Sequence, residues 1–205
     1  MRIRIVLALA VALAALASPA PAAEQALKRH TIRGEGVSLG VPASWVAVDG
    51  RKLLSQTNLA QLSRENPNLA PFLQALAQSG SPLRFVALDP ALRGGFATNV
   101  NLISVRLPGS LTFEQYRQAL LAGLQAVKPI GGKVASSVVR IDGKPALRVS
   151  FRFRLTAGRS FTVQTRQYAF LHRGKSLVFT YTTVPRFQGI YAQTFTASAT
   201  SIRFR

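Results

Sequence analysis

Four consecutive extended segments near the C-terminal end constrain the fold more than any other feature of the chain. They are rich in Val, Thr, Phe and Tyr and span residues 133–141, 146–156, 160–172 and 175–184. Each joint between them contains a glycine, namely Gly143, Gly158 or Gly174. Glycine tolerates the positive φ of tight hairpin turns, so segments joined in this way tend to pair antiparallel. The pattern predicts a four-stranded meander.

The second of these segments alternates strictly between polar and apolar residues. One face would carry Arg148, Ser150, Arg152 and Arg154, and the other would carry Val149, Phe151, Phe153 and Leu155. Successive side chains of a strand point to opposite faces of a sheet, so the alternation predicts which face is buried. We expect the apolar face to pack against the core.

The rest of the chain predicts short strands and helices around this meander. The expected elements are a polar lead-in at 24–30, extended segments at 31–33, 36–41 and 45–48, a broken helix at 53–65 and 67–78, strands at 83–88 and 96–107, and a last helix at 187–198. The break in the first helix is placed at Asn66 because the residue before a proline avoids the helical region.

The clearest helix signal lies at residues 112–115, which fit a capping box. The Thr112 hydroxyl can accept a hydrogen bond from the amide of Gln115, and the Gln115 side chain can bond back to the amide of Thr112. Apolar residues such as Tyr116 and Leu124 follow at helical spacing. We expect an amphipathic helix that ends before Pro129.

The order of these features resembles that of the Mog1/PsbP-like family of secreted α/β proteins. The resemblance covers residues 30–205, and its one local motif is the turn Val41-Pro42-x-x-Trp45. It implies an α+β fold in which an antiparallel sheet of about six strands is packed by helices on both faces. It implies no catalytic residue. Members include extrinsic photosystem subunits, proteins that bind a small GTPase, and bacterial envelope proteins without an assigned activity.

The first 22 residues have the three parts of a secretory signal peptide. Arg2 and Arg4 supply a positive start, residues 5–16 form an unbroken apolar stretch, and residues 20–22 are small enough for a signal peptidase. Cleavage after Ala23 fits equally well. The alternative is a retained N-terminal anchor, although the stretch is short for a bilayer span. We expect a secreted protein, either periplasmic, cell-wall associated or extracellular, with no transmembrane anchor after cleavage.

Residues 23–205 are expected to form a single domain without disulfides. The chain has no cysteine, which also excludes a lipid anchor on a thiol. A domain of this length can bury about 70% of its unfolded surface, so one hydrophobic core is sufficient. Without the two arginines of the leader, 24 basic and 7 acidic side chains remain, a net charge of +17. Such a charge attracts anionic polymers or membranes, unless it reflects biased codon usage alone.

The patterns that could carry catalysis are incomplete. Residues 36–40 match G-x-S-x-G around Ser38, but an extended stretch follows where a nucleophile elbow needs a helix. Residues 174–176 are similar to the end of a phosphate-binding loop, but Ala169 stands where the first glycine belongs. Two histidines and seven scattered acids show no metal-ligand spacing, and we expect His172 to be a solvated turn residue. We therefore expect a protein without enzymatic activity, metal or cofactor.

The strongest candidate site is a set of cations on the predicted meander. Its members are Arg148, Arg152, Arg154, Arg166, Arg140 and Lys144. Guanidinium groups suit phosphates and carboxylates because each can donate two parallel hydrogen bonds. Two alternatives are an ordinary solvated face and arginine stems that lie under a helix with exposed tips. The aromatic residues lie on the opposite face of the strand. A protein that binds nucleic acid by stacking bases needs aromatic and cationic residues on the same surface.

These features predict a non-enzymatic binding protein of the cell envelope or extracellular space. Its basic sheet face would contact an anionic envelope polymer, lipid headgroups or an acidic protein, and no specific nucleic acid. The alternative is a module that binds a small apolar ligand, or assists its transport, in a pocket between sheet and helices. Salt should weaken binding to a cationic face and leave an apolar pocket nearly unaffected.

Overall fold

The computed structural model describes residues 26–80, 82–126, 133–157 and 159–205. The predicted signal peptide at residues 1–22 lies outside these ranges. Within them, no helix is both long enough and apolar enough to cross a bilayer.

Within these ranges, the main sheet has seven antiparallel strands in the spatial order β3-β4-β5-β9-β8-β7-β6. Their bounds are β3 Val46–Asp49, β4 Leu83–Leu88, β5 Asn99–Arg106, β6 Ala135–Ile141, β7 Lys144–Ala157, β8 Arg159–His172 and β9 Lys175–Thr183. Strands β6 to β9 are the predicted meander, which is confirmed. Asp142, Gly143, Arg173 and Gly174 all have positive φ, as two-residue hairpin turns require.

In the part of the chain that the structure describes, a second sheet of three strands packs on the main sheet, in the order β1-β2-β10. It consists of β1 Leu27–Ile32, β2 Val37–Pro42 and β10 Arg203–Phe204. The prediction of a polar lead-in at 24–30 is therefore wrong, because β1 pairs with β2 from Leu27 onward. Strand β3 confirms the extended segment predicted at 45–48, and the main sheet has one strand more than the six or so that the resemblance implies.

Four α-helices lie in the described residues: α1 Gln56–Glu65, α2 Ala70–Gln78, α3 Phe113–Ala126 and α4 Gln188–Thr200. Short 3-10 helices lie at Gly50–Leu54, Pro67–Leu69 and Pro185–Phe187. The capping box is confirmed: the amide of Gln115 donates to the Thr112 hydroxyl at 3.2 Å, and the amide of Thr112 donates to the Gln115 side chain at 2.9 Å. The predicted break before Pro67 is confirmed as well.

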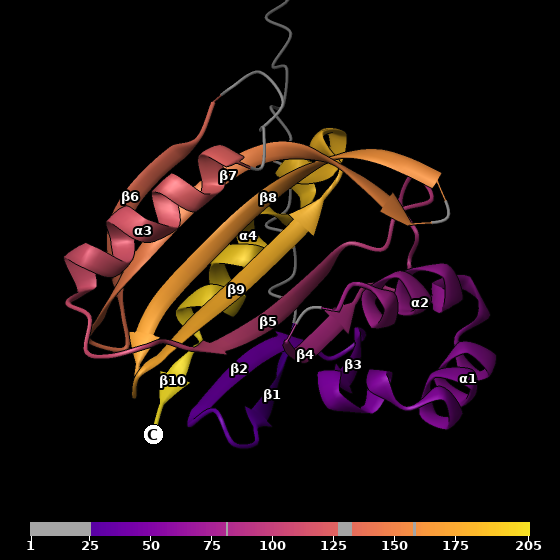
Figure 1. Cartoon of the computed structure of the whole chain (residues 1–205). Coiled ribbons are helices and arrows are strands. Elements are labelled where there is room, and N and C mark those ends of the chain that lie inside the picture. Colours follow the sequence, from indigo (N-terminus) through magenta and orange to yellow (C-terminus); the bar gives the residue numbers. More distant parts are fainter. Residues whose placement is uncertain (1–25, 81, 127–132, 158) are drawn as a thin grey trace, which may run out of the picture.

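Helices pack on both faces of the main sheet, as predicted (Figure 1). On one face, Tyr116 and Leu124 of α3 pack against Val149 and Phe151 of β7. Farther along the same face, α2 packs over Phe161 of β8. Of the apolar residues of the alternating strand, Val149 and Phe151 are buried under α3, and Phe153 and Leu155 are half-buried beside the α2 cluster. Helix α4 packs on the opposite face with the second sheet.

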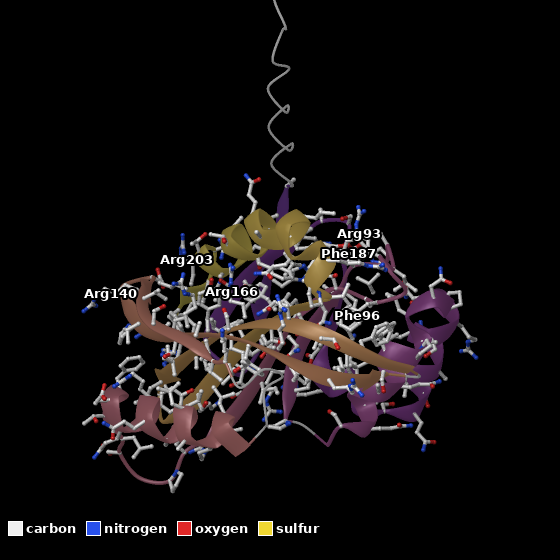
Figure 2. All side chains as sticks on the ribbon, turned by 90° about the horizontal axis from the view of Figure 1, so that it is seen from above. Arg93, Phe96, Arg140, Arg166, Phe187 and Arg203 are labelled. Atoms are coloured by element: carbon white, nitrogen blue, oxygen red, sulfur yellow. The ribbon has the colours of Figure 1, made fainter. Side chains whose placement is uncertain are left out.

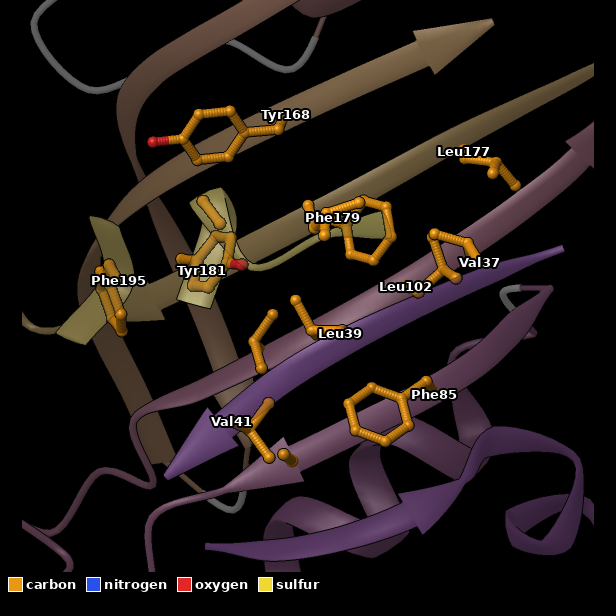
Figure 3. Close-up of a cluster of buried hydrophobic side chains, with 14 of the residues drawn as sticks. Val37, Leu39, Val41, Phe85, Leu102, Tyr168, Leu177, Phe179, Tyr181 and Phe195 are labelled. Atoms are coloured by element: carbon orange, nitrogen blue, oxygen red, sulfur yellow. The ribbon is translucent and has the colours of Figure 1, made fainter. Parts of the chain in front are cut away.

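Strand β2 packs its apolar side chains into the core on the α4 side of the main sheet (Figure 3). Val37, Leu39 and Val41 are fully buried and belong to one cluster with Phe85 and Phe179 of the main sheet. All six residues of β2 are buried, because the main sheet covers one side and α4 approaches the other.

The approach of α4 to β2 depends on Gly40. Ser201, the C-cap of α4, accepts a hydrogen bond from the amide of Gly40 at 2.7 Å. The hydroxyl of Ser198 donates to the carbonyl of Gly40 at 2.6 Å. Both backbone groups of one glycine are therefore occupied by the last turn of the helix.

Gly40→Ala is expected to destabilise the protein by about 1–3 kcal/mol. The added Cβ would lie 2.9 Å from Oγ and 3.2 Å from Cβ of Ser201, whose short side chain cannot turn away without losing its bond to the strand. Gly123→Ala in α3 is the control, because its Cβ would meet no heavy atom within 4 Å and alanine favours a helix. Urea unfolding measures both. Equal stability of Gly40→Ala and wild type would contradict the close approach.

Candidate anion-binding face

Three arginines of β7, Arg148, Arg152 and Arg154, are exposed on the same face of the main sheet as α4. The register shows this, since Arg148 lies opposite Tyr168 of β8, and Tyr168 belongs to the buried cluster beneath α4. The helix packs over the central strand β9 and over β2. The arginines lie to one side of it, where β7 continues toward the edge of the sheet.

Arg166 of β8 is the fourth cation of this surface, and it lies at the margin of α4 (Figure 2). It is half-buried, lies opposite Ser150 of β7, and donates to the hydroxyl of Thr196 on α4 at 3.4 Å. We call the surface formed by Arg148, Arg152, Arg154 and Arg166 the basic face.

Three of the four side chains of the basic face, those of Arg148, Arg152 and Arg166, donate hydrogen bonds to neutral partners. Arg148 Nε donates to Ser137 Oγ at 3.1 Å, and Arg152 Nε donates to Gln164 Oε1 at 3.0 Å. Within the described residues, none of its four arginines forms an ion pair. No acidic residue follows Asp142 in the sequence, whereas eleven basic residues do. Among the described residues, neighbouring acids therefore do not neutralise the positive charge of this surface.

The other two predicted site residues do not extend the basic face. Arg140 lies three positions from Ser137, so alternation directs it away from the face of Arg148, and its Nη1 donates to the carbonyl of Gly143. It lies at the outer end of β6 in Figure 2. Lys144 places its ammonium 5.4 Å from the centre of the Phe204 ring. The sequence groups Arg140 with the arginines of β7, but the register of β6 and β7 places it on the other face of the sheet.

A small hollow lies between the sheet and α4 beside Arg166. It is lined by Ser150, Gln164, Arg166, Thr183, Gln188, Ala192 and Phe195 and measures about 10 Å³. A space of this size admits about one water molecule. This hollow is too small and too polar for the apolar ligand of the alternative hypothesis.

A separate cluster of charges surrounds Glu35 at the turn between β1 and β2. Glu35 is buried, accepts from Ser104 Oγ at 2.6 Å, and pairs with Lys175 at 2.9 Å and Arg84 at 3.0 Å. Burial alone would raise the pKa of Glu35, but hydrogen bonds from Ser104 and Lys175 and the charges of Lys175 and Arg84 outweigh it and lower the pKa. The carboxylate is therefore fully engaged in holding the second sheet to β4, β5 and β9.

The catalytic patterns of the sequence have structural explanations. Ser38 is buried in β2 and accepts from Arg29 Nη1 at 3.2 Å. It lies in the middle strand of the second sheet rather than at a strand-to-helix turn. Lys175, in the glycine-lysine-serine sequence, begins β9 after a hairpin turn and is bound to Glu35. In the described ranges, no three potential ligand residues gather as a metal site would require.

His172 is not the solvated turn residue that the sequence predicts. It is 7% exposed, and its ring packs on that of Phe204 with 4.8 Å between centroids. Burial lowers the pKa of His172, and the positive charges of Lys144, Arg173 and Lys175 lower it further. The histidine is buried because β10, which is distant in sequence, covers the end of β8.

Comparisons with solved structures identify the fold. The chain matches the solution structure of cyanobacterial PsbP from Synechocystis at 14% identity over 93% of this chain and 99% of that chain, with a TM-score of 0.50. It matches a protein of unknown function, PA94 from Pseudomonas aeruginosa, at 12% identity over 87% and 97%, with a TM-score of 0.51. No family model and no curated protein matches.

A third structure of the same fold is LpqN of Mycobacterium tuberculosis, described as involved in cell envelope biogenesis. The identity is 11% over 86% of this chain and 90% of that chain, with a TM-score of 0.51. The chain therefore has the PsbP-like fold that the sequence predicts, a mixed α+β architecture with an antiparallel sheet. At these identities the likeness defines the fold and leaves the function to be argued from this chain's own residues.

Glu35→Gln is expected to lower the free energy of unfolding at neutral pH by about 2 kcal/mol, because Lys175 and Arg84 lose their counter-ion. The folded pKa lies below its ordinary value of about 4.3, so the wild type loses this contribution as the pH falls through the folded pKa. The two proteins should therefore approach equal stability in acid. Urea titrations from neutral pH to about pH 3 measure the difference. A difference that stays constant over this range would contradict a charged Glu35.

Proposed function

We propose that this chain is an exported, non-enzymatic envelope or extracellular protein that holds an anionic partner on its basic face. The observation that carries the proposal is the set of four arginines beside α4 that have no acidic partner within the described ranges. An unneutralised cationic surface raises the local concentration of anions and speeds their association.

The geometry of the basic face suits an extended anion. Residues two apart on a strand point the same way about 7 Å apart, so Arg152 and Arg154 are neighbours, and Arg148 lies about 20 Å from Arg154. Each guanidinium can bind a phosphate or carboxylate by donating two parallel hydrogen bonds. Arg148 and Arg152 each use Nε for a neutral partner, which orients the planar group and leaves donors for a ligand.

Contacts to an anion on this face would be polar rather than stacked. Phe151 lies on the opposite face of β7, where α3 buries it. Bases of single-stranded nucleic acids need aromatic rings beside the cations, so this arrangement favours a polymer, headgroup or protein that offers charge alone.

Export is supported by the leader and by the fold. Residues 1–22 have the charge, apolar stretch and small residues of a secretory signal. A protein of the same fold, LpqN, is described as involved in cell envelope biogenesis. Detection of the mature chain outside the cytoplasm, with Ala23 or Glu24 at its N-terminus, would test the location directly.

The test of binding is a variant in which Arg148, Arg152, Arg154 and Arg166 are replaced by serine. Its matched control, Arg33/Lys52/Arg64/Arg106→Ser, removes four exposed cations from other parts of the surface. Binding to anionic phospholipid vesicles, a wall polyanion and an acidic protein is measured at rising salt. The basic-face variant should lose affinity, and its salt dependence should become shallower by about one unit of slope per arginine that contacts the anion. Equal losses in both variants would mean that only net charge matters.

A further inference from the structure

The outer edge of β6 is an open sheet edge in the described part of the chain. The strand ends the order of the main sheet and pairs with β7 in an unbroken register from Ala135 to Ile141. It contains no proline, no lysine and no bulge, which are the features that usually protect a strand edge from pairing. Figure 1 shows it at the outer side of the sheet, away from β1 and β2.

The backbone groups that face outward can be assigned from the register. Pro145 of β7 lies opposite Arg140 of β6. A proline has no amide proton, so this is a pair without cross-strand hydrogen bonds. Because hydrogen-bonded and non-hydrogen-bonded pairs alternate along an antiparallel ladder, Ser136 and Val138 also form pairs without cross-strand hydrogen bonds. The amides and carbonyls of Ser136, Val138 and Arg140 therefore point away from β7 and are available to a further strand.

The side chains at this edge indicate which side chains an added strand would need. Val138 is 54% exposed, which is unusual for a valine within a strand, and an added strand would cover it. On the other face, Arg148 reaches across β6, because its Nε bonds to Ser137 Oγ at 3.1 Å. Strands lie about 4.8 Å apart, so a carboxylate on a neighbouring strand opposite Ser137 can meet this guanidinium.

Charge around the edge is positive. Lys133, Arg140 and Arg148 are exposed along it. The nearby Asp142 accepts from the amide of Phe204 at 2.7 Å and pairs with Arg203 at 3.8 Å, so it is engaged at the hairpin end. An acidic partner is complementary to this edge.

We propose that β6 binds an acidic protein segment in extended conformation, which adds an eighth strand to the main sheet. Resting on the proposed function, this inference selects an acidic protein among the possible anionic partners of the basic face. Main-chain hydrogen bonds to Ser136, Val138 and Arg140 supply affinity, and the side chains of the added strand supply specificity. The favoured segment has acidic residues on the face of Arg148 and an apolar residue opposite Val138.

A second copy of this chain fits the edge less well. Its own β6 would bring Lys133 and Arg140 of each copy to a shared interface, and the whole chain carries a formal charge of +19. Like charges at neighbouring positions destabilise strand pairing. Concentration-dependent dimers would therefore count against the proposed occupant.

The experiment measures binding of a peptide of about eight residues in which glutamate alternates with valine and threonine, long enough for one strand. A glutamate-proline peptide of equal length and charge is the control, because it stays extended but cannot pair as a regular strand. Both peptides are added to the wild type and to the Val138→Pro variant. The proline removes the amide proton of residue 138, which points away from β7, and breaks no hydrogen bond to β7. Val138→Thr is the matched variant that keeps the amide.

The expected result is binding of the first peptide to the wild type and to Val138→Thr, and a loss of at least about tenfold in Val138→Pro. Amide exchange of Ser136, Val138 and Arg140 in the wild type should slow when this peptide is added, a readout that does not depend on any variant folding. Val138→Pro should bind anionic vesicles or wall polyanion as the wild type does.

Three results would overturn the inference. They are equal affinity for both peptides, unchanged exchange at the three amides, and a dimer of the wild type that Val138→Pro abolishes. In each case the basic face can still bind anions, so the proposed function is tested separately by the arginine-to-serine variant. If the wild type binds no anionic probe at all, both proposals fail together.

Discussion

Strand β2 is buried on both of its sides, and much of the fold is arranged around that constraint. Val37 and its apolar neighbours pack into the main sheet, while Gly40 lies against Ser201 at the end of α4. A side chain at Gly40 would collide with the helix end, so strand and helix have one permitted separation. At the other end of β2, Glu35 binds Lys175 of β9. The second sheet and α4 therefore pack on the main sheet as one layer.

The basic face is the part of the sheet that this layer leaves uncovered. Arg166 lies at its margin and bonds to Thr196 of α4, while the arginines of β7 extend beyond it. On the other face, α3 and α2 bury the aromatic side chains of the same strand. One strand thus contributes apolar residues to the core and cations to the surface. The division follows from strand geometry, which sends alternate side chains to opposite faces.

The distribution of acids explains why the positive charge persists at this surface. Glu35 is occupied by a buried cluster, Asp89 accepts from the hydroxyl of Tyr191, and Asp142 binds the backbone of Phe204. These carboxylates stabilise turns and layer contacts, and among the described residues none of them forms an ion pair with an arginine of β7. Charge alone attracts many anions without discrimination. The open edge of β6 next to Arg148 adds directional backbone groups, and these can distinguish an extended protein segment from other polyanions.

The sequence by itself determined the elements whose signals are local. The meander follows from glycine at its joints, and the helix after Thr112 follows from its capping box; the alternation around Arg148 also predicted which residues of β7 are buried. Tertiary structure decided what depends on distant partners. Residues from Leu27 onward form a strand only because β2 pairs with them, and His172 is buried only because β10 covers it. Burial and pairing are properties of two segments together, so neither segment's own pattern contains them.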